Sequence, residues 1–236
     1  MDKASEQLML IGGTALVYPQ RAGEILRQAA FDSILYAQLV ANKHAGSRFE
    51  QYDAWYAANR EAFRQLGWIK LASTHDLKQL GQPVRSTQLQ PLEAWLKMRA
   101  ISPEALLTTV RAGLRRSAQG VGHLLKFSAQ EQGQRSRLVV EVGLLKAGPT
   151  LDLCSITLQV DERISAVPLN VLLSEQVLRG EAEFNGISLA LDNGRFEHQR
   201  TALQALMEDR NARGDYRFDP YAPVVGATPR RTLPLR

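Results

Sequence analysis

Cysteine and histidine are scarce in this sequence, which has one cysteine, Cys154, and four histidines among 236 residues. A lone cysteine excludes an intramolecular disulfide framework and a zinc centre built on cysteines. The histidines stand singly, and no two have the i, i+4 spacing that places metal ligands on one helix face. We therefore expect no bound metal and no cofactor.

Long apolar runs are missing too. No run approaches the roughly 20 residues that a helix needs to span a bilayer. The amino terminus lacks the basic region, apolar region and small-residue cleavage site of a secretory signal. We expect a cytoplasmic protein, and export by a route without a cleaved signal is the alternative.

The motifs of common catalytic classes are absent as well. The sequence has no GxSxG, HExxH, phosphate-binding loop or dinucleotide-binding glycine pattern. His75 and Asp76 are an adjacent histidine–carboxylate pair, and with His123 they are our candidates for a catalytic site assembled from distant residues. A loop or helix cap is the structural alternative for the pair. We lean towards a protein that is not an enzyme.

The composition is that of an ordinary folded protein, with 44% hydrophobic and 22% charged residues. The length suits one large domain or two small ones. The net charge of +5 permits binding to acidic surfaces without requiring it.

Residues 47–71 carry the strongest pattern. Ser47 and Glu50 have the spacing of a capping box at a helix start. Gly67 suits the helix end, and Trp68 begins an extended stretch. Between these signals, large apolar residues recur at steps of three and four on one helical face. We expect a central core helix made by Tyr52, Trp55, Tyr56, Asn59, Phe63 and Leu66, with Trp68 after it. An aromatic ligand site is the alternative.

Three further helices are predicted before residue 120. Residues 20–43 are apolar on more than one side and should pack antiparallel to the 47–66 helix. Residues 91–100 form a short helix. Residues 103–118 form another, with Ser102 as its cap, Pro103 in its first turn and Gly120 as its stop.

The hydrophobic period then changes from about 3.6 to 2, which predicts strands. Residues 136–146 and 151–160 flank a glycine–proline turn and form an antiparallel hairpin candidate, with a bulge near Cys154 where the alternation shifts phase. Residues 123–129 and 183–192 are further strand candidates, and residues 196–211 form a last helix. Residues 161–180 carry the weakest pattern, and within them residues 169–178 could form a short helix or an edge segment.

The predicted fold class is α+β: an N-terminal helical layer of about four helices packed with a C-terminal antiparallel sheet and a final helix. The predicted regions are a helical one (1–120), a β-rich one (121–216) and an extended Pro/Arg tail (217–236). The segment DAWYAANREAFRQLGWIK resembles a motif, WY followed by a helical turn and LGW, of bacterial proteins that are helical first and β-rich later. The resemblance implies this order of elements and no activity.

Both chain ends are candidate docking segments. Residues 8–18 are apolar around Gly12 and Gly13, which argues against one continuous helix. We expect a packed arm there, and a mobile segment that inserts into a partner or a membrane surface is the alternative. The interaction residues that we name in the two end segments are Leu10, Ile11, Tyr221, Arg230 and Arg231.

The first functional hypothesis is a non-enzymatic interaction or assembly protein, a homo-oligomer or a partner of another protein, that docks through these end segments. The second is a membrane-active component of a toxin system, because several apolar helices and a positive charge accompany the glycine-interrupted segment. The third is an enzyme with an assembled site. Nucleic-acid binding is not expected, because the arginines lack interleaved aromatic residues.

Overall fold

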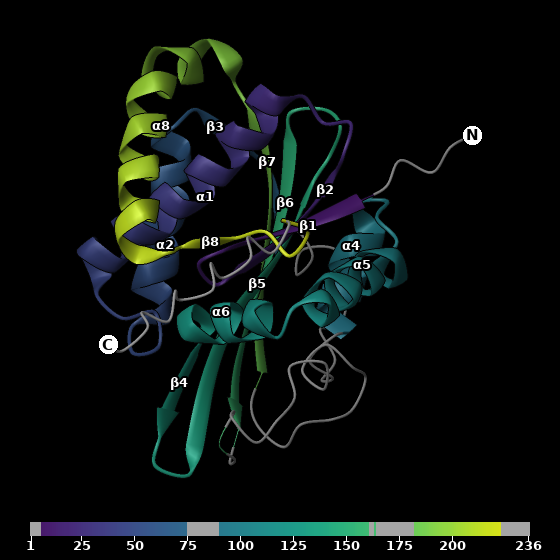
Figure 1. Cartoon of the computed structure of the whole chain (residues 1–236), viewed down its shortest axis with the longest axis vertical. Coiled ribbons are helices and arrows are strands. Elements are labelled where there is room, and N and C mark those ends of the chain that lie inside the picture. Colours follow the sequence, from purple (N-terminus) through teal and green to yellow (C-terminus); the bar gives the residue numbers. More distant parts are fainter. Residues whose placement is uncertain (1–5, 75–89, 161–162, 164–181, 223–236) are drawn as a thin grey trace, which may run out of the picture.

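A computed structural model describes residues 6–74, 90–160, 163 and 182–222 of the chain. Figure 1 shows the elements in order. They are β1 (Glu6–Ile11), β2 (Thr14–Pro19), α1 (Glu24–Ala45), α2 (Tyr52–Gln65), β3 (Trp68–Ser73), α4 (Gln90–Met98), α5 (Pro103–Arg116), α6 (Ala118–Ser128), β4 (Ala129–Gln132), β5 (Arg135–Leu145), β6 (Thr150–Val160), β7 (Ala182–Leu191), α8 (Asn193–Gly214) and β8 (Arg217–Phe218).

The strands form one mixed sheet in the order β3-β7-β6-β5-β2-β1-β8, and β4 pairs with β5. The β2–β5 pair is parallel and the other pairs are antiparallel. The class α+β is therefore correct, but the division into an N-terminal helical layer and a C-terminal antiparallel sheet is wrong. Strands β1, β2 and β3 come from the predicted helical region and complete the sheet.

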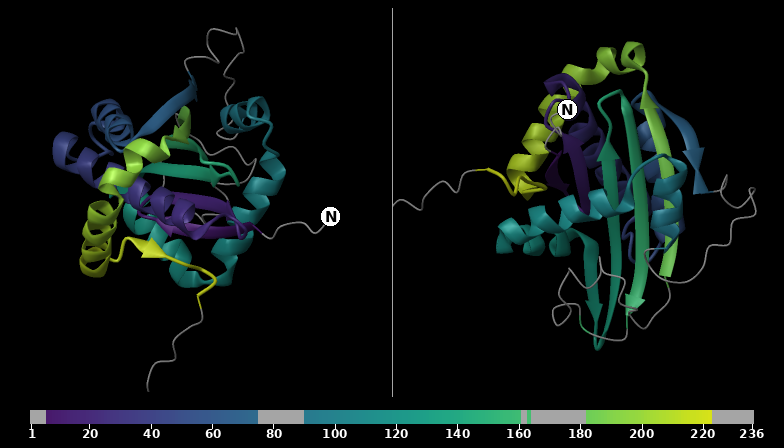
Figure 2. Two further views of the ribbon diagram at one scale, coloured as in Figure 1. Left: turned by 90° about the horizontal axis from the view of Figure 1, so that it is seen from above. Right: turned by 90° about the vertical axis from the view of Figure 1, so that its right-hand side faces the viewer.

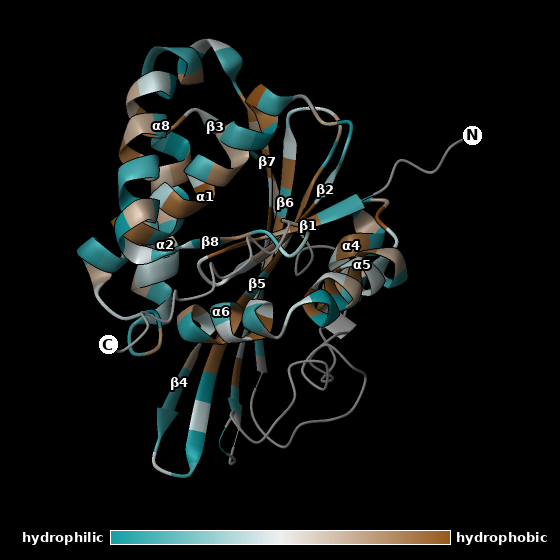
Figure 3. Cartoon of the chain, in the orientation of Figure 1, coloured by the Kyte–Doolittle hydropathy of each residue, from teal (hydrophilic) through white to brown (hydrophobic). Residues whose placement is uncertain are grey.

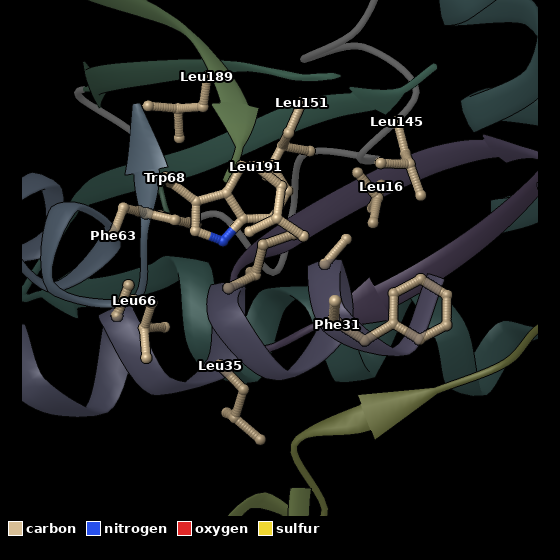
Figure 4. Packing of buried hydrophobic residues seen from close by; sticks show 14 of the residues in the cluster. Leu16, Phe31, Leu35, Phe63, Leu66, Trp68, Leu145, Leu151, Leu189 and Leu191 are labelled. Carbon is tan, nitrogen blue, oxygen red and sulfur yellow. The ribbon is translucent and has the colours of Figure 1, made fainter. Parts of the chain in front are cut away.

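Helices cover both faces of this sheet, as the two views of Figure 2 show. Helices α1, α2 and α8 pack on one face, and α4, α5 and α6 pack on the other. Figure 4 shows part of the first of these cores, to which Trp68, Phe63, Leu189, Leu16 and Phe31 all contribute side chains. β4 and the neighbouring end of β5 extend beyond the helices and are hydrophilic (Figure 3).

Burial on both faces explains why the predicted bulge near Cys154 is wrong. β5 and β6 pair without a register shift from Ser136↔Val160 to Leu145↔Leu151. Leu151 and Leu153 belong to the core under α1, α2 and α8, whereas Cys154 belongs to the core under α4, α5 and α6. Apolar residues in both phases are therefore what a strand buried on both faces requires.

The α2 segment largely matches its prediction. All six residues of the stripe and Trp68 are buried. Gly67 has φ +88°, which is the left-handed conformation expected at a helix end. The capping box is wrong: α2 begins at Tyr52, and the Ser47 hydroxyl accepts from Phe49 N (3.2 Å) in the preceding turn.

The predicted strand at residues 123–129 is wrong, because residues 118–128 form α6 instead. The Ser117 hydroxyl accepts from Gln119 N at the helix start, and Gly120, predicted as a stop, lies inside the helix. The preceding helix begins as predicted, with the Ser102 hydroxyl accepting from Ala105 N (3.3 Å), and it ends at Arg116.

Candidate functional site

The two-residue turn between β1 and β2 opens onto a buried polar network. Gln38 of α1 donates to the Thr14 hydroxyl (2.7 Å) and to the Ile11 carbonyl (3.2 Å). The Thr14 hydroxyl donates to Glu141 Oε2 of β5 (2.7 Å), and all three polar side chains are buried. Burial raises the pKa of the Glu141 carboxyl, and the bond from Thr14 and the Arg48 charge oppose that shift.

Arg48 is the buried cation of this region and is 6% exposed. Its guanidinium donates to the Phe127 carbonyl and lies 5.1 Å from the ring centroid of Trp55. Burial lowers the pKa of Arg48 to about 10, against the opposing effect of Glu141. The guanidinium is charged at neutral pH and favours the ionised form of Glu141.

Tyrosines of α2 extend the polar network towards the surface. Tyr52 donates to the Ser155 hydroxyl (2.9 Å) and accepts from Asn185 Nδ2 of β7 (3.4 Å). Its ring stacks on Tyr56, with centroids 5.5 Å apart. Arg60 lies over the ring of Tyr56, 4.0 Å from its centroid.

Tyr56, Arg60 and Asn185 also line a groove of about 680 Å³ on the α2 side of the sheet. Helix α2 forms its wall, and β7 and β3 form its floor. Aromatic, aliphatic and charged side chains line it, with Arg195 of α8 among them. The other lining residues are Asp53, Ala57, Glu61, Arg64, Trp68, Ile69, Lys70, Glu183, Ile187 and Leu189.

The edge of the sheet beside this groove exposes apolar surface. Ile69 and Leu71 of β3 are 49% and 52% exposed, and they are two of the four large hydrophobic residues that stand exposed in the described part of the chain. The pairing of β3 with β7 shifts register between Lys70 and Ala72, so that Leu71 lies in a bulge. Half-exposed apolar residues beside a groove are a feature of binding surfaces.

A second charged cluster lies on the opposite face of the sheet, around the buried Asp152 of β6. Arg99 Nε lies 3.2 Å from Asp152 Oδ1, and Arg99 also donates to the Ser188 hydroxyl (2.8 Å). Lys146 Nζ lies 3.1 Å from Asp152 Oδ2, an ion pair without the alignment of a hydrogen bond. These contacts fasten the end of α4 and the β5–β6 turn to the sheet, which is a structural role.

His123, one of the proposed catalytic residues, is enclosed by β8. Its Nε2 lies 3.1 Å from the Tyr216 carbonyl oxygen, and its ring contacts Phe127 and Phe218. Burial lowers the pKa of His123. His75 and Asp76 lie outside the described residues. No described group of three or more histidine, cysteine or acidic side chains is arranged to hold a metal ion.

The interaction residues predicted from the sequence fall into three groups: fully buried, partly buried, and outside the described residues. Leu10 and Ile11 are fully buried in β1, one on each face of the sheet. Tyr221 is partly buried, with the Arg116 guanidinium 4.6 Å from its ring centroid. Arg230 and Arg231 lie outside the described residues. No helix in the described ranges is both long and apolar enough to cross a membrane.

The polar network was not predicted from the sequence, although the sequence carries a signal for the β1–β2 hairpin whose turn opens onto that network. Two apolar runs separated by Gly-Gly are typical of a β-hairpin with a two-residue turn, and Ile11↔Thr14 pairing closes that turn. Glu141 alternates with apolar residues along the strand, so the sequence pattern places it on the face of the strand that is exposed to solvent. Only the helices that pack on that side bury it.

Comparison of the chain with models of protein families, with curated proteins and with solved structures gave no significant match.

Proposed function

We propose that this chain is an interaction protein that assembles with copies of itself through the groove between α2 and β3–β7. The observation that carries the proposal is the groove beside an edge strand with two half-exposed apolar side chains, Ile69 and Leu71. Contiguous exposed apolar surface with a polar rim is typical of protein-binding sites.

The residues of the groove suit a protein surface. Tyr56, Trp68 and three arginines line it, and tyrosine, tryptophan and arginine are the residue types enriched at protein interfaces. The polar network behind α2 adds support, because bonds from Tyr52 to Ser155 and Asn185 fix that wall in place. A rigid wall loses little conformational entropy on docking.

We assign the docking role to this groove and not to the chain ends, to which the sequence analysis assigned it. Leu10 lies in a strand paired on both sides, with β2 and with β8. Exchange of that strand between copies would break both pairings, whereas the groove is open in the folded chain. The remainder of the predicted Pro/Arg tail, residues 223–236, lies outside the described residues.

Extension of the sheet by a β3–β3 pairing is less suited to this edge. β3 carries the bulge at Leu71 and the exposed Lys70. Bulges and edge lysines are the features by which sheet edges resist pairing with another chain. Docking on the face of the groove avoids both obstacles.

The test is the molar mass by light scattering across the micromolar range. One chain has a mass of 26.3 kDa, and we expect the wild type to exceed that value as concentration rises. Ala57→Arg places a long side chain in the groove and should shift the association to higher concentration. Ala112→Arg is the matched control, since Ala112 is an exposed residue of α5 on the other side of the sheet.

A wild type that keeps the mass of one chain throughout this range would refute self-assembly. Equal effects of Ala57→Arg and Ala112→Arg would refute the groove as the contact surface. Thermal unfolding of both variants checks that neither change acts through stability.

A further inference from the structure

The groove has opposite charges at its two ends. Asp53 and Glu183 line the end where α2 and β7 begin. Arg64, Lys70 and Arg195 line the other end, where α2 finishes and α8 starts. Glu61 also lies near the basic end, where Arg64 binds it. The basic end therefore keeps an excess of positive charge.

Contacts along β7 fix the separation of these ends. Tyr52, next to Asp53, bonds with Asn185 of β7. Lys70 pairs with Leu189, four residues further along the same strand. Four residues of an antiparallel strand span about 14 Å. The two ends are therefore more than a Debye length apart at physiological salt, which is about 8 Å, so each end presents its own charge to a partner.

Asp53 and Lys70 are the uncommitted charges of the two ends. Arg64 is paired with Glu61, and Arg195 with Asp192 at 3.4 Å. Within the described part of the chain, neither Asp53 nor Lys70 forms an ion pair, and both are exposed. These two side chains can therefore bind a partner's charge without giving up a contact of their own.

We propose that two copies dock groove to groove about a twofold axis, with their α2 helices antiparallel and Asp53 of each copy facing Lys70 of the other. This inference rests on the proposed self-assembly and specifies its geometry. A twofold axis makes both copies use the same surface. Antiparallel docking then brings each acidic end against a basic end, twice per dimer. Parallel docking would bring like charges together, which is unfavourable.

The middle of the groove suits close contact between the copies. Ala57 lines it between the charged ends and is exposed, so a second backbone can approach α2 there. Tyr56, Ile187 and Leu189 supply the aromatic and aliphatic surface beside it. Arg60 also lines the middle and lies over the ring of Tyr56. Charges at both ends set the direction of docking, and the aromatic and aliphatic side chains of the middle supply the area buried from water.

The test uses two charge reversals, Asp53→Lys and Lys70→Glu, in the full chain. Each variant alone places like charges at both contacts of the dimer, and we expect about tenfold weaker self-association, which is equivalent to about 1.4 kcal/mol. An equimolar mixture of the two variants restores opposite charges at both contacts. We expect the mixture to form a dimer with about wild-type affinity and the mass of two chains.

Glu104→Lys is the matched control. Glu104 is an exposed acid in the first turn of α5, as Asp53 is in the first turn of α2. Both changes remove the same favourable interaction with a helix N-terminus. Glu104→Lys should leave self-association unchanged. Its mixed dimer with Lys70→Glu should bind more weakly than the Glu104→Lys homodimer, because one of the two contacts still places Asp53 against the reversed charge at position 70.

The outcomes separate this geometry from the proposed function. A monomeric wild type overturns both. If the wild type associates but the charge reversals have no effect, the antiparallel pairing is overturned and the self-assembly stands. The same conclusion follows if mixing the two reversed variants does not restore association. Rescue at a mass well above two chains also overturns the twofold dimer, because it indicates head-to-tail contacts that do not close.

Discussion

Gly12 and Gly13 leave room for the two long polar side chains that meet at the β1–β2 turn. A Cβ on Gly12 would lie 2.1 Å from Gln38 Oε1, and one on Gly13 would lie 2.6 Å from Arg48 Nη1. Gly12 also has φ +52°, which side-chain-bearing residues rarely adopt. The turn therefore needs glycine for its conformation at the first position and for space at both.

Glu141 should make the stability of the fold fall with rising pH. Burial raises its pKa above the ordinary value of 4.5, so the folded state binds this proton more tightly than the unfolded state does. Such a group stabilises the fold below its unfolded-state pKa, and this contribution is lost as pH rises through the folded-state pKa. Glu141→Gln removes the titrating group and keeps an acceptor for the Thr14 hydroxyl.

Urea unfolding of wild type and Glu141→Gln between about pH 4 and pH 8 measures this effect. The free energy of unfolding of wild type minus that of the variant should decrease as pH rises. The other titrating groups cancel in the difference. A difference that is flat or that increases with pH would show that Arg48 and Thr14 outweigh the burial of the carboxylate.

At the scale of elements, the sequence predicted the helices and strands that carry a strong local signal. Helix α2 has one buried face, and its aromatic residues mark that face. β5 and β6 were recognised from their alternation and from the turn at Gly148-Pro149. These signals are sufficient to place the elements, although the change of phase in β6 reflects burial on both faces and not the predicted bulge.

The elements that were missed depend on contacts distant in sequence. β1 and β2 contain apolar residues in both phases, because Leu10 and Ile11 face different helix layers. α6 buries Leu124 against the sheet, and seven residues of modest alternation did not distinguish it from a strand. The buried acids of the polar contacts were not predicted from the sequence for the same reason. Asp32 and Glu141 look like surface acids until helices and strands from elsewhere enclose them.

β8 is attached to α1 through an ion pair between Arg217 and Asp32. The two side chains are 14% and 3% exposed, and burial raises the pKa of Asp32 although Arg217 opposes the shift. Arg217→Leu leaves the carboxylate buried without its cation and should destabilise the fold by about 3 kcal/mol. Urea unfolding measures this loss.

The double variant Asp32→Asn/Arg217→Leu serves as the control for that change. It removes the buried charge together with its partner, while the amide that replaces the carboxylate can still accept from Gln28, which donates to Asp32 in the wild type. More than half of the lost stability should return. A double variant as unstable as Arg217→Leu would indicate that the arginine stem, and not the charge pair, holds β8 in place.

For the whole molecule, the shared sheet should make the two helix layers unfold together. Both layers pack on the same strands, and Leu153 and Cys154, adjacent in β6, face different layers. Loss of either layer would expose one entire face of the sheet to water. We therefore expect a single cooperative transition, without separate unfolding of the predicted regions 1–120 and 121–216.

Tryptophan and thiol probes can test this cooperativity in the two layers separately. Trp55 and Trp68 lie with α1 and α2, Trp95 lies in α4, and Cys154 is 1% exposed beneath α4–α6. Trp55→Phe/Trp68→Phe leaves Trp95 as the fluorescent reporter, and Trp95→Phe leaves the other two. Within each variant, the urea midpoint from fluorescence should coincide with that from circular dichroism.

Labelling of Cys154 supplies the kinetic form of the same experiment. Burial raises the pKa of its thiol, so reaction with a thiol reagent requires an opening that exposes the sheet. The opening free energy obtained from the labelling rate should equal the global free energy of unfolding when reclosing is fast. Labelling that is much faster, together with a Trp95 transition at lower urea, would indicate that α4, α5 and α6 detach as a unit while α1, α2 and α8 keep the other face of the sheet covered.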